Sequence, residues 1–255
     1  MTWKTFALAL LWASTLLVGC GPTPQDLAFR SVERCRHSAV VPAQMNVPQV
    51  ASWYGPRHEA VNQRLRQGHV DLLFIGDSIT NGWDSTGKEV WDRYYAPRNA
   101  VNMGFGWDRT QHVLWRLDHS DLTEISPRLA IVMIGTNNSG GRDNTAAEIA
   151  DGIITICKRL RARLPRTKIL LLAIFPRDLG PSPQRDKNAE ASLLASRIAD
   201  GRWIHYLDIN QEFLTPDGRL SRDIMPDFLH PNKAGYEIWA KAIESKVKEL
   251  MGERE

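Results

Sequence analysis

Short apolar runs and longer amphipathic stretches alternate along most of this chain. A short apolar run that stops at glycine or polar turn residues is typical of a strand buried on both faces of a parallel sheet. Five such runs predict strands over Val70–Ile75, Ala100–Met103, Leu129–Ile134, Lys168–Ile174 and Trp203–Leu207. Stretches with apolar residues three or four positions apart predict helices over Lys88–Tyr95, Thr110–Leu117, Thr145–Leu164, Gln184–Ala199 and Asn232–Met251.

The clearest predicted helix is Thr145–Leu164. Thr145 and Glu148 match a capping box at its N-terminus. Its apolar residues fall on one face, at Ile149, Ile153, Ile156, Leu160 and Leu164. Further upstream, Arg57–Gln67 predicts a short helix that ends before Gly68. Residues 27–56 are expected to be irregular, because three prolines, Pro42, Pro48 and Pro56, interrupt them.

The order of these elements predicts the fold class. Strands that are each followed by a helix pair in parallel through right-handed crossovers. The expected fold is therefore a three-layer α/β/α domain built on a parallel five-stranded sheet. The sequence has no composition break, internal repeat or low-complexity segment after residue 30. One domain over residues 57–255 is the simplest arrangement.

Residues 1–19 have the pattern of a signal peptide. Lys4 precedes an uncharged, mainly apolar run over Phe6–Val18, which is too short to span a bilayer. The run ends at Gly19-Cys20, which resembles the bacterial lipoprotein signal, with an ordinary secretory signal as the alternative. We expect a lipid-modified Cys20 at the start of a tether and irregular segment over residues 20–56. This pattern predicts a protein of the bacterial cell envelope, anchored to a membrane on the periplasmic or outer-membrane face.

The two other cysteines leave two readings open. Cys35 and Cys157 could pair in an oxidising envelope. Alternatively, Cys157 could be a buried free thiol on the apolar face of its predicted helix. Neither cysteine has a histidine or cysteine at metal-ligand spacing, and the sequence lacks His-x-x-x-His and His-Glu-x-x-His patterns. The sequence therefore predicts no metal.

Composition narrows the partner classes. The chain has 255 residues, a net charge of +3 and a pI of about 8.8. This charge is mild, and no block of lysine and arginine stands out, so nucleic-acid binding is not expected. Nine tryptophans are many for this length, and aromatic side chains serve both cores and binding walls. The oligomeric state has no signature in the sequence.

Polar and glycine residues follow the predicted strands at their carboxyl ends, where open α/β sheets bind ligands. The first strand leads into Gly76-Asp77-Ser78, and the second leads into a glycine-rich turn over Asn102–Asp108. The third and fourth lead into Gly135–Asn138 and Phe175–Asp178. Asp227-Phe-Leu-His230 precedes the last helix. Since these segments share one edge of the sheet, they predict a single site there.

These residue types suit nucleophilic catalysis. Ser78 could attack a carbonyl, although a serine after a turn is more often a helix N-cap. His230 could act as its base, and Asp227 could bond the other ring nitrogen. Asn137 and the glycine-rich backbone could donate hydrogen bonds to an oxyanion. The pattern Gly-Asp-Ser-Ile-Thr is not Gly-x-Ser-x-Gly, so the nucleophile elbow of α/β-hydrolases is absent.

The four blocks occur in the order of the GDSL-type, or SGNH, hydrolase family, and the resemblance covers most of the chain after Val70. Longer runs over Thr110–Leu117 and Ile134–Asn138 resemble the catalytic subunits of intracellular platelet-activating-factor acetylhydrolase. This resemblance implies a flavodoxin-like fold and metal-free, cofactor-free hydrolysis of esters, often acetyl esters. It also implies a Ser78, His230 and Asp227 triad.

The implied oxyanion donors are the Ser78 N–H, the Asn137 side chain and a backbone N–H that falls at Trp107. The family has glycine at this last position. A tryptophan there keeps the N–H, but a positive φ would strain it. Its indole would stand beside the site and narrow it. The sequence therefore predicts a preference for short acyl groups.

The leading hypothesis is a serine esterase that releases short acyl groups through an acyl-enzyme. A sugar O-acetylesterase, or an acylthioesterase or lysophospholipase on the same residues, is the enzymatic alternative. A different class is an inactive carbohydrate-binding lipoprotein, with Trp83 and Trp107 as stacking walls. Trp83, Phe105, Phe228 and Leu229 are the candidate pocket residues. The sequence does not identify the alcohol that carries the acyl group.

Overall fold

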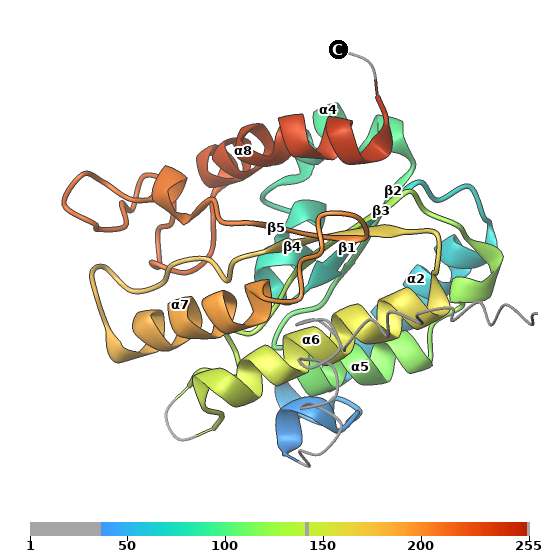
Figure 1. The fold of residues 1–255 in the computed structure, drawn as a ribbon, viewed down its shortest axis with the longest axis horizontal. Helices are drawn as coiled ribbons and strands as arrows, with labels where there is room; N and C mark the ends of the chain where they lie inside the picture. The colour runs from blue at the N-terminus through green and yellow to red at the C-terminus, as the bar shows by residue number, and fades with distance from the viewer. Residues whose placement is uncertain (1–36, 141–142, 254–255) are drawn as a thin grey trace, which may run out of the picture.

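A five-stranded parallel sheet forms the centre of the computed structural model, which describes residues 37–140 and 143–253 (Figure 1). Its strands are β1 (Leu72–Gly76), β2 (Ala100–Gly104), β3 (Leu129–Met133), β4 (Lys168–Leu172) and β5 (Ile204–Leu207). The strand order is β2-β1-β3-β4-β5, and every neighbouring pair is parallel. This is the flavodoxin-like order, so the predicted fold class is confirmed. Each strand also starts within two residues of its predicted start.

Helices cover both faces of the sheet. The α-helices are α2 (Ala51–Arg66), α3 (Ser78–Asn81), α4 (Lys88–Tyr94), α5 (Thr110–Asp118), α6 (Ala146–Arg163), α7 (Pro183–Ser196) and α8 (Lys233–Met251). Short 3-10 helices are η1 (Ser38–Val40), η2 (Pro48–Val50), η3 (Gly82–Asp84), η4 (Ala96–Arg98), η5 (Leu122–Glu124) and η6 (Asn210–Phe213). In Figure 1, α4 and α8 lie above the sheet, whereas α2, α5, α6 and α7 lie below it. These two groups are the outer layers of the expected α/β/α architecture.

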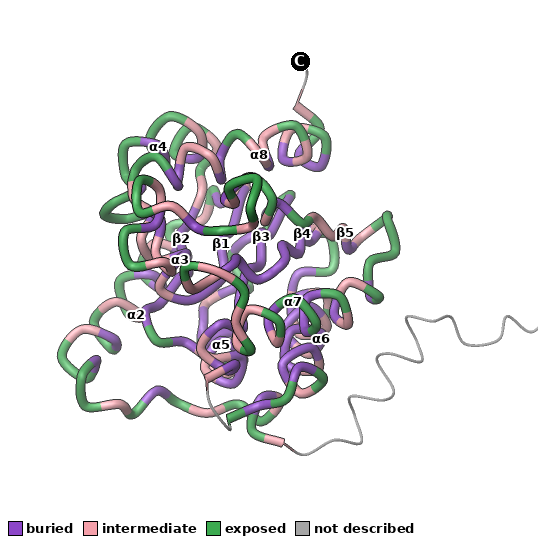
Figure 2. Tube along the Cα trace, turned by 90° about the vertical axis from the view of Figure 1, so that its left-hand side faces the viewer, coloured by how far each residue is buried: buried purple, intermediate pink, exposed green. Residues whose placement is uncertain are grey.

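Alternate residues of each strand enter different cores. On β1, Leu72 and Phe74 pack with the α4–α8 layer, whereas Leu73 and Ile75 pack with the α2–α5–α6–α7 layer. This division follows from the two-residue period of a strand. Strands β1 and β3 are buried along their whole length and β2 and β4 along all but their first residue, as the purple tube in Figure 2 shows, whereas the edge strand β5 is mostly half-buried. Their continuous apolar runs are thereby explained.

The predicted capping box at the start of α6 is confirmed. The Thr145 side chain accepts from the Glu148 N–H, and Glu148 accepts from the N–H of Thr145. Cys157 on this helix is a buried free thiol, and burial raises its pKa to about 12. Cys35 and Cys20 lie outside the described residues.

The expectation of irregular structure up to residue 56 is wrong for residues 51–56, whereas residues 37–50 contain only the short 3-10 helices η1 and η2. Helix α2 begins at Ala51, six residues before the predicted start, and Pro56 lies inside it. Pro56 removes one hydrogen bond near the start of the helix, while the buried Tyr54 side chain anchors this turn in the core. Residue 57 is therefore not an element boundary.

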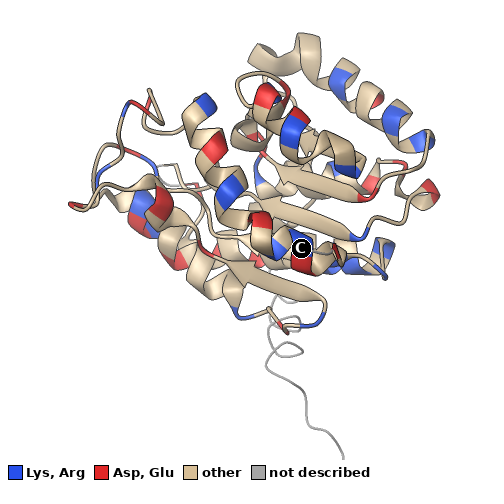
Figure 3. Ribbon diagram, turned by 90° about the horizontal axis from the view of Figure 1, so that it is seen from above, with Lys and Arg blue, Asp and Glu red and all other residues tan. Residues whose placement is uncertain are grey.

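Residues of both charge signs are spread over the helices in the view of Figure 3. Many of them pair, as Arg98 does with Glu244 and Glu253. Within the described ranges, no helix is long and apolar enough to cross a membrane.

Two glycines allow α3 to approach the strand ends. A Cβ on Gly76 would lie 2.1 Å from Thr80 Oγ1, and a Cβ on Gly104 would lie 2.4 Å from the Asn81 backbone nitrogen. Neighbouring strand ends therefore pack directly against the helix that carries Ser78. The following segments of β1, β2 and β3 thus converge at one edge of the sheet.

Gly104→Ala tests this close packing. The added methyl group must displace the α3 backbone, so the free energy of unfolding should fall by about 1–3 kcal/mol. Chemical denaturation would measure the change. A Cβ on Gly180 meets no atom within 4 Å, so Gly180→Ala should change stability by less than about 0.5 kcal/mol. Equal effects of the two substitutions would contradict the packing argument.

Candidate active site

Ser78 is the first residue of α3, immediately after β1. The helix N-cap is Asp77, whose Oδ1 accepts from the Ile79 N–H at 3.0 Å. The Ser78 hydroxyl is therefore not used as a cap. On the other side of α3, the Tyr236 hydroxyl from α8 donates to the Ile79 carbonyl at 2.7 Å. These contacts fix the short helix and leave the Ser78 side chain free for another partner.

That partner is His230. Ser78 Oγ lies 2.9 Å from His230 Nε2, although the two residues are 152 positions apart. His230 Nδ1 lies 2.7 Å from Asp227 Oδ2. A carboxylate only accepts hydrogen bonds, so Nδ1 carries the ring proton of a neutral His230. The lone pair of Nε2 then faces the Ser78 hydroxyl.

Asp227 orients this histidine through more than one bond. Its Oδ1 accepts from the backbone N–H groups of Leu229 at 3.0 Å and His230 at 2.7 Å. Burial alone would raise the pKa of Asp227, but the bonds from His230 outweigh it and hold the pKa below its ordinary value. Phe228, between the two residues, has a φ of +58°. The left-handed turn lets one carboxylate bind both the ring and the backbone of His230.

Three N–H donors lie in the segments that follow β1, β2 and β3. The N–H of Ser78 and the N–H of Trp107 have no protein acceptor within the described part of the chain. Asn137, after β3, donates one N–H to the Asp108 carbonyl at 2.9 Å, and an amide carries a second N–H. Trp107 has a φ of +68°, so it adopts the conformation that glycine favours. The turn is therefore formed despite the tryptophan.

A buried ion pair holds that turn. The Asp108 carboxylate lies 2.6 Å from Arg116 Nη2, and both side chains are fully buried. The Tyr54 hydroxyl donates to Asp108 Oδ1 at 2.6 Å, and the Arg116 guanidinium lies 4.0 Å from the centre of the Phe105 ring. Burial raises the pKa of Asp108 to about 6, against the opposing charge of Arg116. Asp108 thus joins the turn to α2 and α5 by its side chain and to Asn137 by its carbonyl.

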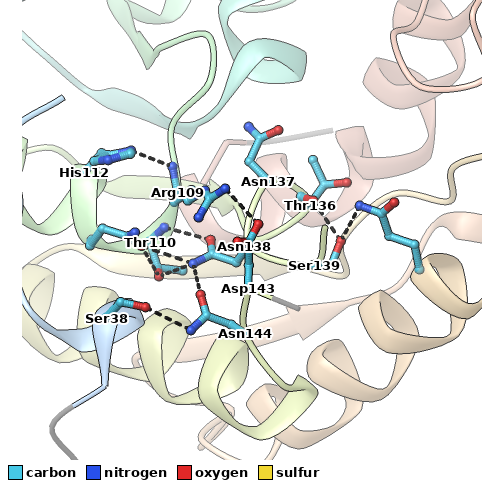
Figure 4. Close-up of polar contacts among 12 residues, drawn as sticks. Ser38, Arg109, Thr110, His112, Thr136, Asn137, Asn138, Ser139, Asp143 and Asn144 are labelled. Atoms are coloured by element: carbon cyan, nitrogen blue, oxygen red, sulfur yellow. Dashed lines mark hydrogen bonds and ion pairs between the residues drawn. The ribbon is translucent and has the colours of Figure 1, made fainter. Parts of the chain in front are cut away.

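The adjacent residues Asn137 and Asn138, which follow β3, make different contacts. The buried Asn138 amide donates to Thr110, Gln111 and Asn144, and its oxygen accepts from the Thr110 N–H. Figure 4 shows Asn138 inside this network, whereas the Asn137 side chain points away from it. Asn138 therefore fixes the loop, whereas the Asn137 side chain lies outside this network.

The pocket candidates divide into two pairs. Trp83 and Phe105 are fully buried in separate core clusters, so the expectation that they line a pocket is wrong. Trp83 packs among rings of α4 and α8 because its neighbours, such as Tyr236 at 4.5 Å between ring centres, enclose it. Phe228 and Leu229 are half-buried beside His230, and Arg222 stacks on the Phe228 ring.

Trp107 is 59% exposed. An indole this exposed does not fill a closed acyl slot, so the expectation that it narrows the site has no support from its burial.

Several residues that shape the site had only weak signals in the sequence. Asp108 ends the glycine-rich turn and Arg116 lies in the helix that follows it. Their ion pair forms only because the fold places this turn against that helix. Tyr54 and Trp53 come from the segment expected to be irregular. Asp77 belongs to the Gly-Asp-Ser motif, but the sequence does not indicate that its carboxyl group is buried. One oxygen of this carboxyl group has no hydrogen-bond partner. Burial raises the pKa of Asp77 to about 7.

The substitution Asp77→Asn tests how much the ionisation of this buried carboxyl group lowers the free energy of unfolding. Its folded pKa of about 7 lies above the ordinary 3.8, so its contribution to stability is complete below that ordinary pKa and is lost as the pH rises through about 7. Between about pH 5 and about pH 8, the variant should gain about 2 kcal/mol of unfolding free energy relative to wild type. Urea denaturation at both pH values measures this. The exposed Asp186→Asn serves as control, and a pH-independent difference for Asp77→Asn would refute the assignment.

Comparisons with known proteins identify the family of this chain. The model of the GDSL-like Lipase/Acylhydrolase family matches residues 74–238. The alpha2 subunit of rat platelet-activating factor acetylhydrolase IB is 38% identical over 184 residues, which are 72% of this chain and 78% of the subunit.

Two solved structures share the fold. A GDSL-like lipase from Bacteroides thetaiotaomicron aligns with a TM-score of 0.59 and 20% identity, over 78% of this chain and 97% of that one. A carbohydrate acetylesterase from Sinorhizobium meliloti aligns with a TM-score of 0.56 and 19% identity, over 71% of this chain and 99% of that one. The match of the family model and the identity to the acetylhydrolase subunit show that this chain belongs to the GDSL-like lipase/acylhydrolase family, and that it is an acylhydrolase.

Proposed function

We propose that this protein hydrolyses esters of short acyl groups through a covalent intermediate on Ser78. The observation that carries the proposal is the continuous chain of contacts from Ser78 Oγ through His230 to Asp227. A serine, a base within hydrogen-bond reach and a group that orients the base are the components of nucleophilic catalysis.

His230 acts first as base and then as acid. As Ser78 Oγ attacks the ester carbonyl carbon, Nε2 takes the hydroxyl proton. The same proton passes to the leaving alcohol when the tetrahedral intermediate collapses to an acyl-enzyme. Water then attacks the acyl group, His230 takes its proton, and the carboxylic acid leaves with Ser78 regenerated. Asp227 stabilises the imidazolium that forms twice in this cycle.

The oxyanion is stabilised by the N–H groups of Ser78 and Trp107 and by the free N–H of Asn137. All three are held before substrate arrives: Ser78 by α3, Trp107 by the anchored turn and Asn137 by its bond to the Asp108 carbonyl. Donors that are fixed in advance lower the barrier without reorganising during the reaction.

The names of two similar proteins support a short acyl group in the substrate. Both the matched rat protein and the Sinorhizobium protein are named for acetyl ester hydrolysis. A sugar acetate is the second candidate substrate, because the Sinorhizobium protein is named as a carbohydrate acetylesterase and the Trp107 indole is exposed on the turn after β2. We also propose that Cys20 carries lipid and that the enzyme works in the cell envelope. This second proposal rests only on the Gly19-Cys20 pattern in the sequence.

Ser78→Ala should lower kcat by several orders of magnitude and leave the protein folded, because the triad acts as a unit. Hydrolysis of p-nitrophenyl acetate and circular dichroism would measure the two properties. Ser85, exposed on the same segment, provides a control: Ser85→Ala should keep wild-type rates. A folded Ser78→Ala variant with near-wild-type kcat would exclude Ser78 as the nucleophile.

The adjacent asparagines should separate catalysis from stability. Asn137→Ala removes one oxyanion donor, so kcat should fall by about 10²–10³. Asn138→Ala should instead lower the free energy of unfolding by about 2–4 kcal/mol, because it leaves buried polar groups unpaired. Kinetics and denaturation on both variants measure this. A change in KM alone for Asn137→Ala would assign that side chain to substrate binding.

A further inference from the structure

The guanidinium of Arg185, in the first turn of α7, binds three backbone carbonyls. Nε donates to the Arg177 carbonyl at 2.7 Å, and Nη2 donates to the Asp178 carbonyl at 2.7 Å. Nη1 donates to the Gly218 carbonyl at 2.8 Å. A planar fork of donors suits several acceptors at once better than the compact ammonium of a lysine. Arg185 therefore holds two consecutive peptide groups of the loop that follows β4.

The residue between these two peptide groups is strained. Asp178 has a φ of +65°, in a region that is unfavourable for a residue with a Cβ. Such a conformation persists only where surrounding contacts enforce it, and Arg185 binds the carbonyls on both sides of the Asp178 Cα. The hydroxyl of Ser182, the N-cap of α7, also donates to the Asp178 carboxylate. Helix α7 thus imposes the conformation of Asp178.

That conformation directs the Asp178 N–H to the loop that carries His230. The N–H donates to the Phe228 carbonyl at 2.8 Å. The Phe228 carbonyl and the Leu229 N–H belong to one planar peptide group, and this second N–H donates to Asp227 Oδ1 at 3.0 Å. The other oxygen of the same carboxylate binds the His230 ring. The loop after β4 is thereby joined to the carboxylate that orients His230.

These bonds form one continuous chain with a single direction. The chain starts at the Arg185 cation, passes through two peptide groups and ends at the Asp227 carboxylate. At every link the donor lies on the Arg185 side, so the peptide dipoles align head to tail. Aligned groups of this kind polarise and strengthen one another, and the opposite charges at the two ends favour the same alignment. The chain therefore couples Arg185 to Asp227 through the backbone.

We propose that Arg185 is a positioning residue for the reaction: through this chain it holds the Asp227 carboxylate, and with it the His230 ring, in the orientation that activates Ser78. The inference rests on the proposed function, because it concerns the same three residues. Displacement of a catalytic group by about 1 Å can lower a rate by about 100-fold. Loss of Arg185 should lower kcat and leave KM unchanged, because Arg185 acts on the base and not on the substrate.

Arg185→Met removes all three bonds and should lower kcat for p-nitrophenyl acetate by about 10- to 100-fold. Arg161 provides a matched control, because its guanidinium donates to the carbonyls of Leu164, Pro165 and Thr167. These carbonyls precede β4, at the opposite edge of the sheet. Arg161→Met should lower the free energy of unfolding comparably but keep the wild-type kcat. A comparable fall of kcat in both variants would overturn the proposal.

A double-mutant cycle with Asp227→Ala separates positioning from a general loosening of the structure. If Arg185 acts through the carboxylate, the effect of Arg185→Met on kcat should shrink to about twofold or less in the Asp227→Ala background, because coupled sites are not additive. Equal fold losses in the two backgrounds would overturn the proposal. Arg185→Lys keeps a cation on a flexible stem, so it should fold and lose less activity. Its loss should shrink in the same way, which decides the question if Arg185→Met does not fold.

Nitrogen NMR of the His230 ring keeps this inference separate from the reaction, because it requires no turnover. The hydrogen bond from Nδ1 to Asp227 determines which ring nitrogen carries the proton of neutral histidine. Wild type and Arg161→Met should hold this proton on Nδ1, whereas Arg185→Met should also populate the Nε2–H tautomer. If the wild-type protein hydrolysed no ester but the tautomer depended on Arg185, the proposed function would fail while the positioning role stood. Identical tautomers in wild type and Arg185→Met would refute the positioning role, even in an active esterase.

Discussion

The contact between Ser78 Oγ and His230 Nε2, at 2.9 Å, is the interaction on which the site depends. It joins a residue after the first strand to a residue before the last helix. For the two atoms to meet, β1 must end at α3, and α8 must hold the Asp227–His230 loop beside it. Tyr236 on α8 supports both conditions through its bond to the Ile79 carbonyl. This one hydrogen bond therefore depends on elements from both ends of the chain.

Backbone strain is concentrated where the site is assembled. Of the non-glycine residues with positive φ in the described chain, Trp107, Asp178 and Phe228 lie in loops at the carboxyl edge of the sheet. The Asp178 N–H donates to the Phe228 carbonyl at 2.8 Å, so two of these strained residues support each other. The third is followed by Asp108, whose buried bonds to Arg116 and Tyr54 fix the turn. Strong local anchoring lets unfavourable conformations persist.

The sequence predicted the parts of the protein that depend on periodic patterns and on strand order. Five apolar runs and their helices were sufficient for the layers, and the strand ends were sufficient to bring Ser78, Asn137 and His230 to one edge. The sequence did not show which side chains at that edge are buried. Trp83 and Trp107 look alike as tryptophans near glycine, yet one is enclosed by the rings of α4 and α8 and the other is exposed.

Two other features could not be predicted because they depend on tertiary contacts. Pro56 suggested a break, but the buried Tyr54 anchors α2 around it. Asp108 and Arg116 are only eight positions apart, but nothing in their spacing indicates that both charges are buried.

The most direct measurement is the site of covalent modification by a fluorophosphonate, which reacts with a serine only when a neighbouring base activates it. The protein would be treated with the reagent, digested and analysed by mass spectrometry. The account predicts a single phosphonylated peptide, modified at Ser78, whose yield falls sharply when His230 is replaced by alanine. Modification of a different serine, or unchanged labelling in His230→Ala, would contradict it.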